Sequence, residues 1–333
     1  MSERLDIREQ TPGDLRKSYG LIRDELARTD RLILDELRSD YPFVDRLAKY
    51  GFRLGGKRLR PALVLLCAKA CGRLTEEHFA LAAAVEMIHT ATLIHDDVLD
   101  EATIRRHLAT VNTQWSNEAS VLLGDYLFAR AVSLASSLET TFACRAIGEA
   151  ARVMCEGELR QIDSRGNYDL TEEEYIEIVA DKTAALCACC CRLGAHYAGA
   201  DTEVREILGN YGRNLGIAFQ IKDDLLDILG DEATTGKSLG TDLVKQKPTL
   251  PLIRLLNRAG DDRDEILSLL SESDNHGREA LRPWFDQGDA VVYSQERAEW
   301  HIRQAKESLQ SLPGSPARKA LAMLADFVVA RML

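Results

Sequence analysis

The chain has 333 residues, of which 45% are hydrophobic and 29% charged, and its formal net charge is -11. Such a composition is ordinary for a soluble globular protein with a sizeable core, and the acidic balance argues against nucleic-acid binding, which needs a basic surface. No apolar run reaches the length of a membrane span. The N-terminal stretch MSERLDIREQTPGD is polar and acidic, unlike a signal or transit peptide. We therefore expect a cytoplasmic protein with no stable membrane anchor.

Helical periodicity recurs along nearly the whole chain, and no stretch alternates in the manner of a strand. The spacing predicts helices over residues 61–70, 79–100, 117–138, 142–162, 172–198, 203–230, 249–258, 294–309 and 315–331. Residues 79–95 and 183–198 are apolar nearly all round, which places them in the middle of a bundle. The prediction is an all-α single domain over residues 1–333. Its first ~20 residues are expected to be loosely held, and residues 260–290 to form a peripheral loop-and-helix excursion.

Four of the eight cysteines lie in one run, residues 187–191. Metal sites need paired ligands at loop-compatible spacings, and this run on a predicted helix lacks them. We interpret these cysteines as buried, reduced thiols that pack a helix face.

The first chemical motif is a basic turn, GGKRLRP at residues 55–61, with Arg53 just upstream. Pro61 suits the first turn of the helix that follows. Cations at a helix N-terminus oppose the helix dipole, and this placement makes sense if a phosphate group binds there. On this motif alone, a solvated basic turn is an equally good interpretation.

Two aspartate clusters share the spacing DDxxD, each after a strongly apolar helical turn. They are Asp96-Asp97-x-x-Asp100 and Asp223-Asp224-x-x-Asp227. Like charges four residues apart destabilise a helix by roughly 0.2–0.5 kcal/mol per pair, and the carboxyl end of a helix disfavours anions further. Divalent cations are the simplest compensation, and oxygen ligands suit hard ions such as Mg2+. One isolated carboxylate pair is commonly a solvated helix end, but the repeat favours metal sites. A di-iron bundle usually needs two Glu-x-x-His motifs on facing helices, and we do not find such a pair of motifs.

Cations follow each aspartate cluster and open another apolar helix. They are Arg105, Arg106, Lys182, Lys237, Lys245 and Lys247. Arginine binds diphosphate oxygens in pairs, whereas lysine supplies a compact point charge. Any one of them is typical of a surface residue. Together with the aspartates they predict a cavity for Mg2+ and diphosphates.

From about Tyr50 onward the chain resembles the trans-isoprenyl diphosphate synthase (polyprenyl synthetase) family. The motifs that carry the resemblance are, in order, GGKRLRP, HTATLIHDDVLDEATIRR, GDYLFARA at 124–131, EGELRQ at 156–161, KTAAL at 182–186, FQIKDDLLDILGD, GKSLGTD and KPTLP. The resemblance implies mostly antiparallel helices around a deep central cavity, usually in a homodimer. It also implies that isopentenyl diphosphate condenses head to tail with an allylic diphosphate, with three Mg2+ ions in each substrate-bound site.

The resemblance further implies roles for individual residues. Isopentenyl diphosphate would be bound by Lys57, Arg60, His89 and Arg106. The metal ligands would be Asp96, Asp100, Asp223 and Asp227, and the catalytic set would be Asp96, Asp97, Asp100, Asp223, Asp224 and Lys182. The allylic diphosphate would be surrounded by Arg105, Lys182, Thr183, Gln220, Lys237 and Lys247, with Glu156, Glu158 and Gln161 as supporting polar residues. His107 stands where the family usually has glycine. This departure puts the family's loop geometry in doubt at this position, but not the chemistry.

In this family, bulky aromatics four or five residues before the first cluster accompany short products. Here these positions hold Thr92 and Ala91, followed one turn further back by Ile88 and then by Val85. Each helical turn adds about 5.4 Å to the available depth, so we predict a long, octaprenyl-like product. The alternative is a short-chain farnesyl or geranylgeranyl product, if a neighbouring helix closes the tube.

Three other functions compete with the synthase as interpretations of this sequence. A class I terpene cyclase handles one diphosphate and has no use for the second basic site. A non-catalytic partner subunit is expected to lose aspartates or basic residues, and both sets are complete here. A purely structural helical protein leaves the six aspartates unexplained.

Overall fold

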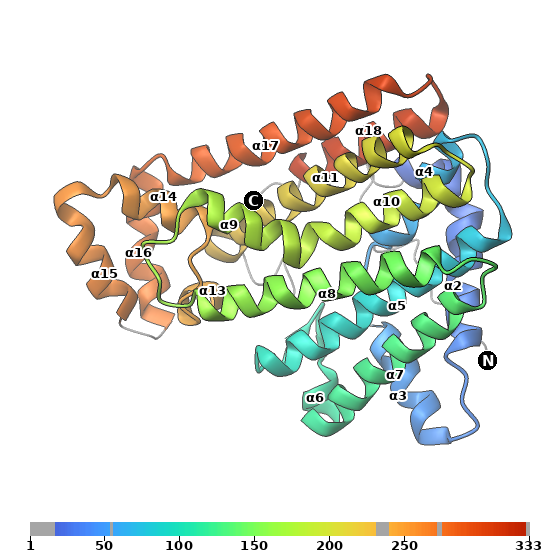
Figure 1. Cartoon of the computed structure of the whole chain (residues 1–333). Coiled ribbons are helices and arrows are strands. Elements are labelled where there is room, and N and C mark those ends of the chain that lie inside the picture. The colour runs from blue at the N-terminus through green and yellow to red at the C-terminus, as the bar shows by residue number, and fades with distance from the viewer. Residues whose placement is uncertain (1–16, 54–55, 231–239, 272–274, 331–333) are drawn as a thin grey trace.

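The computed structural model describes residues 17–53, 56–230, 240–271 and 275–330, and in this part the chain is almost entirely helical (Figure 1). The elements are η1 (Gly20–Ile22), α2 (Arg23–Glu36), α3 (Pro42–Arg53), α4 (Leu59–Ala70), α5 (Glu76–Leu99), β1 (Ile104–Arg105), β2 (Leu108–Ala109), α6 (Val111–Gln114), α7 (Asn117–Ser136), α8 (Phe142–Asp163), α9 (Glu172–Val179), the π-helical turn η2 (Ala180–Ala184), α10 (Ala185–Tyr197), α11 (Thr202–Leu229), α13 (Thr241–Val244), α14 (Leu250–Arg258), η3 (Gly260–Asp262), α15 (Arg263–Ser271), α16 (Asn275–Gln287), α17 (Ala290–Ser308), η4 (Leu309–Ser311) and α18 (Pro316–Ala330). The all-α prediction is confirmed.

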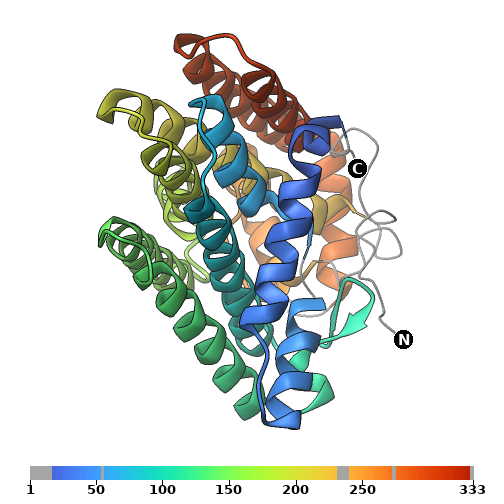
Figure 2. The same ribbon diagram turned by 90° about the vertical axis from the view of Figure 1, so that its right-hand side faces the viewer.

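The centre of the bundle is formed by α5 and α10. Helix α10 packs against α4, α8 and α11, while α5 packs along α7 and against α2 (Figures 1 and 2). Most side chains of both helices are buried, including Met87 on α5 and Leu193 on α10. This confirms the prediction that residues 79–95 and 183–198 lie in the middle of the bundle.

Polar caps fix where several helices begin. The Ser116 hydroxyl accepts a hydrogen bond from the backbone of α7, and the Asp201 carboxylate does so for α11. Thr171 and Glu174 form a reciprocal capping box at α9. Such caps satisfy backbone N–H groups that have no partner inside the helix.

The cysteine interpretation also holds. Cys187, Cys189, Cys190 and Cys191 are free and buried on α10. Burial raises the pKa of the Cys189 thiol to about 12, so the group stays protonated and behaves as a small apolar side chain.

The predicted helices agree with the structure within a few residues, with three differences. The segment predicted as one helix over 172–198 is interrupted by the π-turn η2. A short hairpin, β1–β2, follows the first aspartate cluster where no strand was predicted. Helices α2 and α3 precede the first predicted helix. The expectation for the first ~20 residues falls mostly outside the described residues.

Residues 260–290 form η3, α15 and α16 at one end of the bundle (Figure 1). With α14 they enclose a smaller core that includes Leu252, Ile266, Leu281 and Phe285. This agrees with the predicted peripheral excursion. No helix in the described parts of the chain is long and apolar enough to span a membrane.

Candidate active site

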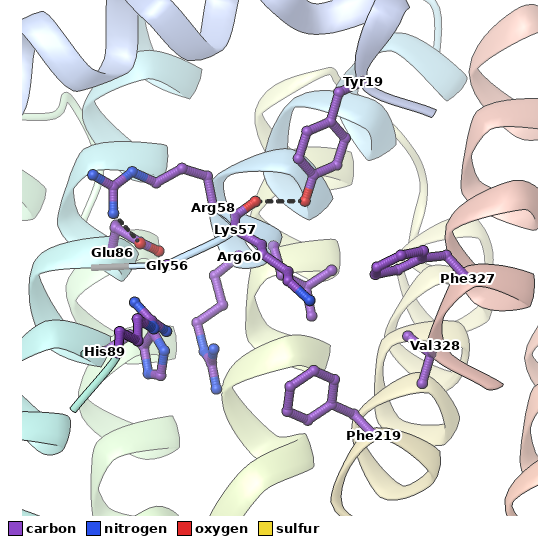
Figure 3. Close-up of a pocket in the computed structure, with 12 residues that line it drawn as sticks. Tyr19, Gly56, Lys57, Arg58, Arg60, Glu86, His89, Phe219, Phe327 and Val328 are labelled. Atoms are coloured by element: carbon purple, nitrogen blue, oxygen red, sulfur yellow. Dashed lines mark hydrogen bonds and ion pairs between the residues drawn. The ribbon is translucent and has the colours of Figure 1, made fainter. Parts of the chain in front are cut away.

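The structure brings the four predicted basic residues together around one pocket (Figure 3). The pocket is lined by Tyr19, Gly56, Lys57, Arg58, Leu59, Arg60, Glu86, His89, Arg106, Phe219, Phe327 and Val328. Its basic side chains come from the start of α4, from α5 and from the β1–β2 hairpin, while α11 and α18 supply an apolar wall. The structure thus places Lys57, Arg60, His89 and Arg106 at one pocket, and their binding of isopentenyl diphosphate stays a prediction.

The electrostatics of this pocket favour an anion. Burial, followed by the charges of Arg60 and Arg106, lowers the pKa of His89 well below its ordinary value. His89 is therefore neutral near pH 7 and offers one N–H donor. The Nε atom of Arg60 is buried without a hydrogen-bond partner, an arrangement that costs free energy unless a ligand supplies an acceptor.

Two aromatic residues flank Lys57. Its Nζ lies 5.2 Å from the ring centroid of Phe327 on α18, which is within the range of a cation–π contact. The hydroxyl of Tyr19 donates to the Lys57 carbonyl at 2.8 Å (Figure 3). Segments near both ends of the described chain therefore help to place one basic side chain.

The first aspartate cluster closes helix α5, with Asp100 at its C-cap. Burial, together with Glu158 and Asp100, raises the pKa of Asp96 to about 6 against the opposing effect of Lys182. Asp100 forms an ion pair with Lys245, and Lys247 Nζ is 3.9 Å from the same carboxylate. Burial alone would raise the pKa of Asp100, but the lysines outweigh it and lower the pKa below its usual range.

Asp97 has a different environment from the other two aspartates of the first cluster. It is 1% exposed, and one oxygen accepts a hydrogen bond from Arg105 Nε at 2.7 Å. Asp97 thus ties α5 to the β1–β2 hairpin. Arg105, predicted to contact the allylic diphosphate, is held by this aspartate.

In the second aspartate cluster, Asp224 is the residue with the most defined support. It accepts hydrogen bonds from the Tyr175 hydroxyl at 2.6 Å and from Gln220 Nε2 at 2.7 Å. Burial, with the charge of Asp242, raises the pKa of Asp224 to about 7. Asp227 instead accepts from the Asp242 backbone N–H at 3.1 Å, so it also shapes the start of α13.

The π-turn η2 contacts the second aspartate cluster through Gln220 and acts on the first cluster through the charge of Lys182. Lys182 lies 2.6 Å from Glu158 and donates to Gln161 at 2.6 Å, both on α8. Thr183 donates to Gln220 at 2.8 Å, and Gln220 in turn holds Asp224. Single π-turns inside helices are frequent at functional sites because they redirect side chains.

Two glycines allow η2 to pack closely on both sides. A Cβ added at Gly157 on α8 would lie 2.5 Å from the backbone nitrogen of Lys182. One added at Gly216 on α11 would lie 2.5 Å from Cα of Ala184. Larger residues at either position would push the turn away from its neighbour.

Some predicted site residues are placed differently from expectation. Glu156 is exposed and pairs with Arg152 on the outer face of α8, because it lies two residues, or roughly 200°, from Glu158 around the helix; its assignment as a supporting residue was wrong. Lys237 falls outside the described residues. Lys247 contacts Asp100 and Asp242.

Sequence reasoning also missed residues that contribute to the site. Tyr175 holds Asp224, and Lys245, noted only as one of several cations, pairs with Asp100. The role of Tyr175 could not be recognised in the sequence because its partner, Asp224, lies 49 residues away. Arg58 was visible in the basic turn, but nothing in the motif separated it from its neighbours.

The carboxylates around η2 fit hard divalent cations. Within the described residues, no three Asp, Glu, His or Cys side chains already stand close enough to hold a metal ion together. Even so, Asp96, Asp100 and Glu158 influence one another electrostatically, and the raised pKa of Asp96 shows that its negative charge is poorly compensated. Oxygen-only donors of this kind suit Mg2+ or Ca2+.

An all-α bundle that joins two aspartate clusters to a desolvated basic pocket is the arrangement of an isoprenoid-synthase-type enzyme. Comparisons with known proteins agree with this class. The family model described as polyprenyl synthetase matches residues 41–286. The chain is 38% identical over 321 residues to octaprenyl diphosphate synthase of Escherichia coli K12, an alignment that covers 96% of this chain and 99% of the relative.

Two other similarities bear on fold and product. The crystal structure of a polyprenyl synthase from Caulobacter crescentus CB15, complexed with calcium and isoprenyl diphosphate, matches with a TM-score of 0.92 and 36% identity, covering 97% of this chain and 99% of that one. A short chain isoprenyl diphosphate synthase from Methanothermobacter thermautotrophicus is 38% identical over 291 residues, covering 86% of this chain and 90% of the relative. The chain belongs to the polyprenyl synthetase family.

Proposed function

We propose that this chain is a trans-polyprenyl diphosphate synthase that condenses isopentenyl diphosphate with an allylic diphosphate, head to tail. The observation that carries the proposal is the coexistence of a basic pocket and two aspartate clusters that both interact with η2, one through Gln220 and the other through the charge of Lys182. One diphosphate would account for the aspartates, and the second explains the pocket. A class I terpene cyclase leaves the pocket without a purpose.

Different residues of the site would bind the two diphosphates. Lys57, Arg60 and Arg106 neutralise the isopentenyl diphosphate, and neutral His89 donates one hydrogen bond to it. Lys182 and Thr183 face the allylic diphosphate from η2. Holding two anions together in one site removes much of the entropic barrier to their reaction.

Mg2+ is the proposed cofactor, with three ions in each substrate-bound site. Asp96, Asp100, Asp223 and Asp227 would hold the ions. The calcium in the Caulobacter polyprenyl synthase structure supports use of a divalent cation. When bound, the ions would neutralise charge on the departing diphosphate and so favour ionisation of the allylic carbon–oxygen bond.

We propose a long-chain product, because small side chains precede the first aspartate cluster. Thr92, four residues before Asp96, is partly exposed. Ala91 and Ile88 are only 2% and 1% exposed, so Thr92 is the accessible position of the three. The similarity to the E. coli octaprenyl diphosphate synthase covers more of the chain than the short-chain similarity, which supports the same choice.

The activity is tested by incubating the protein with isopentenyl diphosphate, Mg2+ and allylic primers of several lengths, followed by chain-length analysis. We expect elongated all-trans products with a distribution centred on long chains. Absence of elongation with every primer would overturn the proposal. Products that stop at fifteen or twenty carbons, three or four isoprene units, would refute only the long-chain part.

The position of the tail is tested by introducing an aromatic ring before the first aspartate cluster. Thr92→Phe should shorten the product because this position is partly exposed. Ala91→Phe, the equivalent change in the packed core, should shorten the product or destabilise the fold. Unchanged product length in both folded variants would refute the assignment of this helix face.

We also propose that the chain forms a homodimer through α7. Val121, Leu122, Phe128 and Val132 are 38–66% exposed and lie on one face of that helix. Apolar patches of this kind commonly mark interfaces. Light scattering of the wild type should give a dimer, and Leu122→Arg should shift it toward monomer. A wild-type monomer at micromolar concentration would contradict this proposal.

A further inference from the structure

Arg58 also lines the pocket, but its guanidinium extends toward Glu86 and away from the side chains of Lys57 and Arg60 (Figure 3). Its side chain is 8% exposed. Nε donates to Asp30 Oδ1 on α2 at 2.8 Å, and Nη1 donates to Glu86 Oε1 on α5 at 2.9 Å. The guanidinium carbon is 4.2 Å from the ring centroid of Phe52 on α3. One side chain therefore connects the start of α4 to three other helices.

The backbone at Arg58 is strained. Its φ of 54° and ψ of 35° lie in the left-handed region, which is unfavourable for a residue with a Cβ. The Arg58 carbonyl nevertheless accepts the first helical bond, from Ala62 at 3.0 Å. A sharp turn of the chain thus sits directly before α4, and it needs external contacts to persist.

Those contacts join the guanidinium to two carboxylates. Burial lowers the pKa of the guanidinium, but Glu86 and Asp30 outweigh it and raise the Arg58 pKa overall. Charge-assisted hydrogen bonds to carboxylates are about twice as strong as neutral ones. The planar guanidinium also fixes direction, which a lysine ammonium does not.

The contacts of Arg58 with Asp30, Glu86 and Phe52, here called the anchor, affect the positions of the basic residues in the pocket. Lys57 and Arg60, on either side of the turn, both line the pocket. Glu86 lies three residues before His89 on α5, so the two share a helix face. Fixing Arg58 to Glu86 therefore sets the distance between the basic turn and the helix that carries His89.

We propose that Arg58 is a positioning residue: its contacts with Asp30, Glu86 and Phe52 hold the left-handed turn so that Lys57, Arg60 and His89 converge on one diphosphate. The proposal rests on the proposed function, in which this pocket takes isopentenyl diphosphate. It predicts that loosening the anchor weakens binding of that substrate and leaves the allylic site intact.

The test uses conservative variants that retain the charge of the pocket wall. Arg58→Lys keeps the positive charge but loses the planar fork, and Asp30→Asn removes one anchor on a residue outside the pocket. We expect the Kd for isopentenyl diphosphate, measured by calorimetry without allylic substrate, to rise about tenfold, equivalent to about 1.4 kcal/mol. The KM for the allylic diphosphate and kcat at saturation should change less than twofold.

A second anchor in the same protein supplies a matched control. Arg28 on α2 pairs with Glu76 on α5, and its guanidinium carbon lies 4.1 Å from the ring centroid of Phe79. Neither Arg28 nor Glu76 lines the pocket. Arg28→Lys and Glu76→Gln should leave the Kd for isopentenyl diphosphate unchanged, even where they lower the melting temperature.

Glu86→Gln separates positioning from simple electrostatics. Removing a negative charge beside the pocket would by itself tighten binding of a diphosphate. Loss of the anchor weakens it, and weaker binding is the result we expect. Tighter binding in Glu86→Gln, or unchanged binding in folded Arg58→Lys and Asp30→Asn, would overturn the proposal.

Two further results keep this test decisive. If Arg58→Lys fails to fold, the triple variant Asp30→Asn, Arg58→Met, Glu86→Gln removes the buried charges as a set, a change that proteins often tolerate. We expect its Kd to stay at least tenfold raised, and recovery to the wild-type value would refute the positioning role. A wild type that binds isopentenyl diphosphate but elongates no primer would refute the synthase proposal and leave the binding comparison to decide the role of Arg58.

Discussion

Replacing Gly157 by alanine tests whether close helix packing positions the π-turn η2. The new Cβ would lie 2.5 Å from the backbone nitrogen of Lys182 and 2.9 Å from Cβ of Asp181. An ordinary contact begins near 3.4 Å, so α8 and η2 must separate by about 0.9 Å (3.4 minus 2.5) because backbone atoms cannot swing aside.

This displacement allows the losses of stability and of rate to be estimated. Overpacking of this kind costs about 1–3 kcal/mol, partly offset by the ~1 kcal/mol that alanine gains over glycine in a helix. The contacts from Lys182 to Glu158 and Gln161 on α8, now 2.6 Å each, would lengthen to about 3.5 Å, where a hydrogen bond is lost. A misplacement near 1 Å can cost up to about 100-fold in rate.

We expect kcat/KM for the allylic diphosphate to fall about 10- to 100-fold in Gly157→Ala, with the Kd for isopentenyl diphosphate unchanged. Gly148→Ala is the matched control, because Gly148 lies on the same helix with nothing within 4 Å of its added Cβ. It should leave activity unchanged and stabilise the protein by about 0.5–1 kcal/mol. Gly157→Ala activity within threefold of the wild type would show that η2 is not held by this contact.

Three further results are expected. Gly56→Ala should raise the KM for isopentenyl diphosphate about tenfold with little change in melting temperature. The three atoms nearest to the added Cβ all belong to the guanidinium end of Arg106, which would have to move. An unchanged KM would argue against a role for Arg106. His107→Gly should increase the free energy of unfolding in urea by about 1 kcal/mol, because His107 has a φ of 63°; a decrease would show that its side chain stabilises the hairpin. Burial and nearby positive charge lower the pKa of His301 to about 4. The unfolded chain therefore takes up this proton first, and stability should fall by about 2 kcal/mol between pH 7 and pH 5. His301→Gln should abolish that part of the pH dependence, as measured by urea unfolding at both pH values.

The all-α fold could be predicted from the sequence because helix formation depends on the local spacing of apolar residues. The apolar spacing from 203 to 230 predicted α11 to within one residue at each end, and Asp201 supplies the side-chain cap before it. The π-turn was not predictable in the same way. Its backbone depends on Gly157 and Gly216, which lie on two other helices.

Residues of the candidate site also differ in how far they could be predicted from the sequence. The residues proposed to bind substrate, such as Lys57 and His89, stand in short motifs that can be recognised in the sequence. Residues that support them lie far away in sequence. Asp30 and Glu86 each lie 28 residues from Arg58, and neither stands in a motif that indicates an ion pair. Only the packing of α2 and α5 against the start of α4 brings them together.

The hairpin after the first aspartate cluster shows why a departure from the family pattern can be tolerated. Arg106 and His107 form its two-residue turn, with φ values of 53° and 63°. Both central residues of such a turn need positive φ, which explains why glycine is usual at the second position. The Arg105–Asp97 bond fixes the strand just before the turn, so the hairpin retains its shape with histidine there.

The paired aspartates also acquire a physical explanation. In isolation, each cluster stacks like charges at the unfavourable end of a helix. In the folded chain the partners differ: Asp97 pairs with Arg105, Asp100 with Lys245, and Asp224 with neutral Tyr175. Asp96 has a pKa of about 6 because burial and its carboxylate neighbours outweigh the opposing charge of Lys182. Within the first cluster, a divalent cation would therefore gain the most electrostatic stabilisation at Asp96, whose charge is also felt by Lys182 on the π-turn η2.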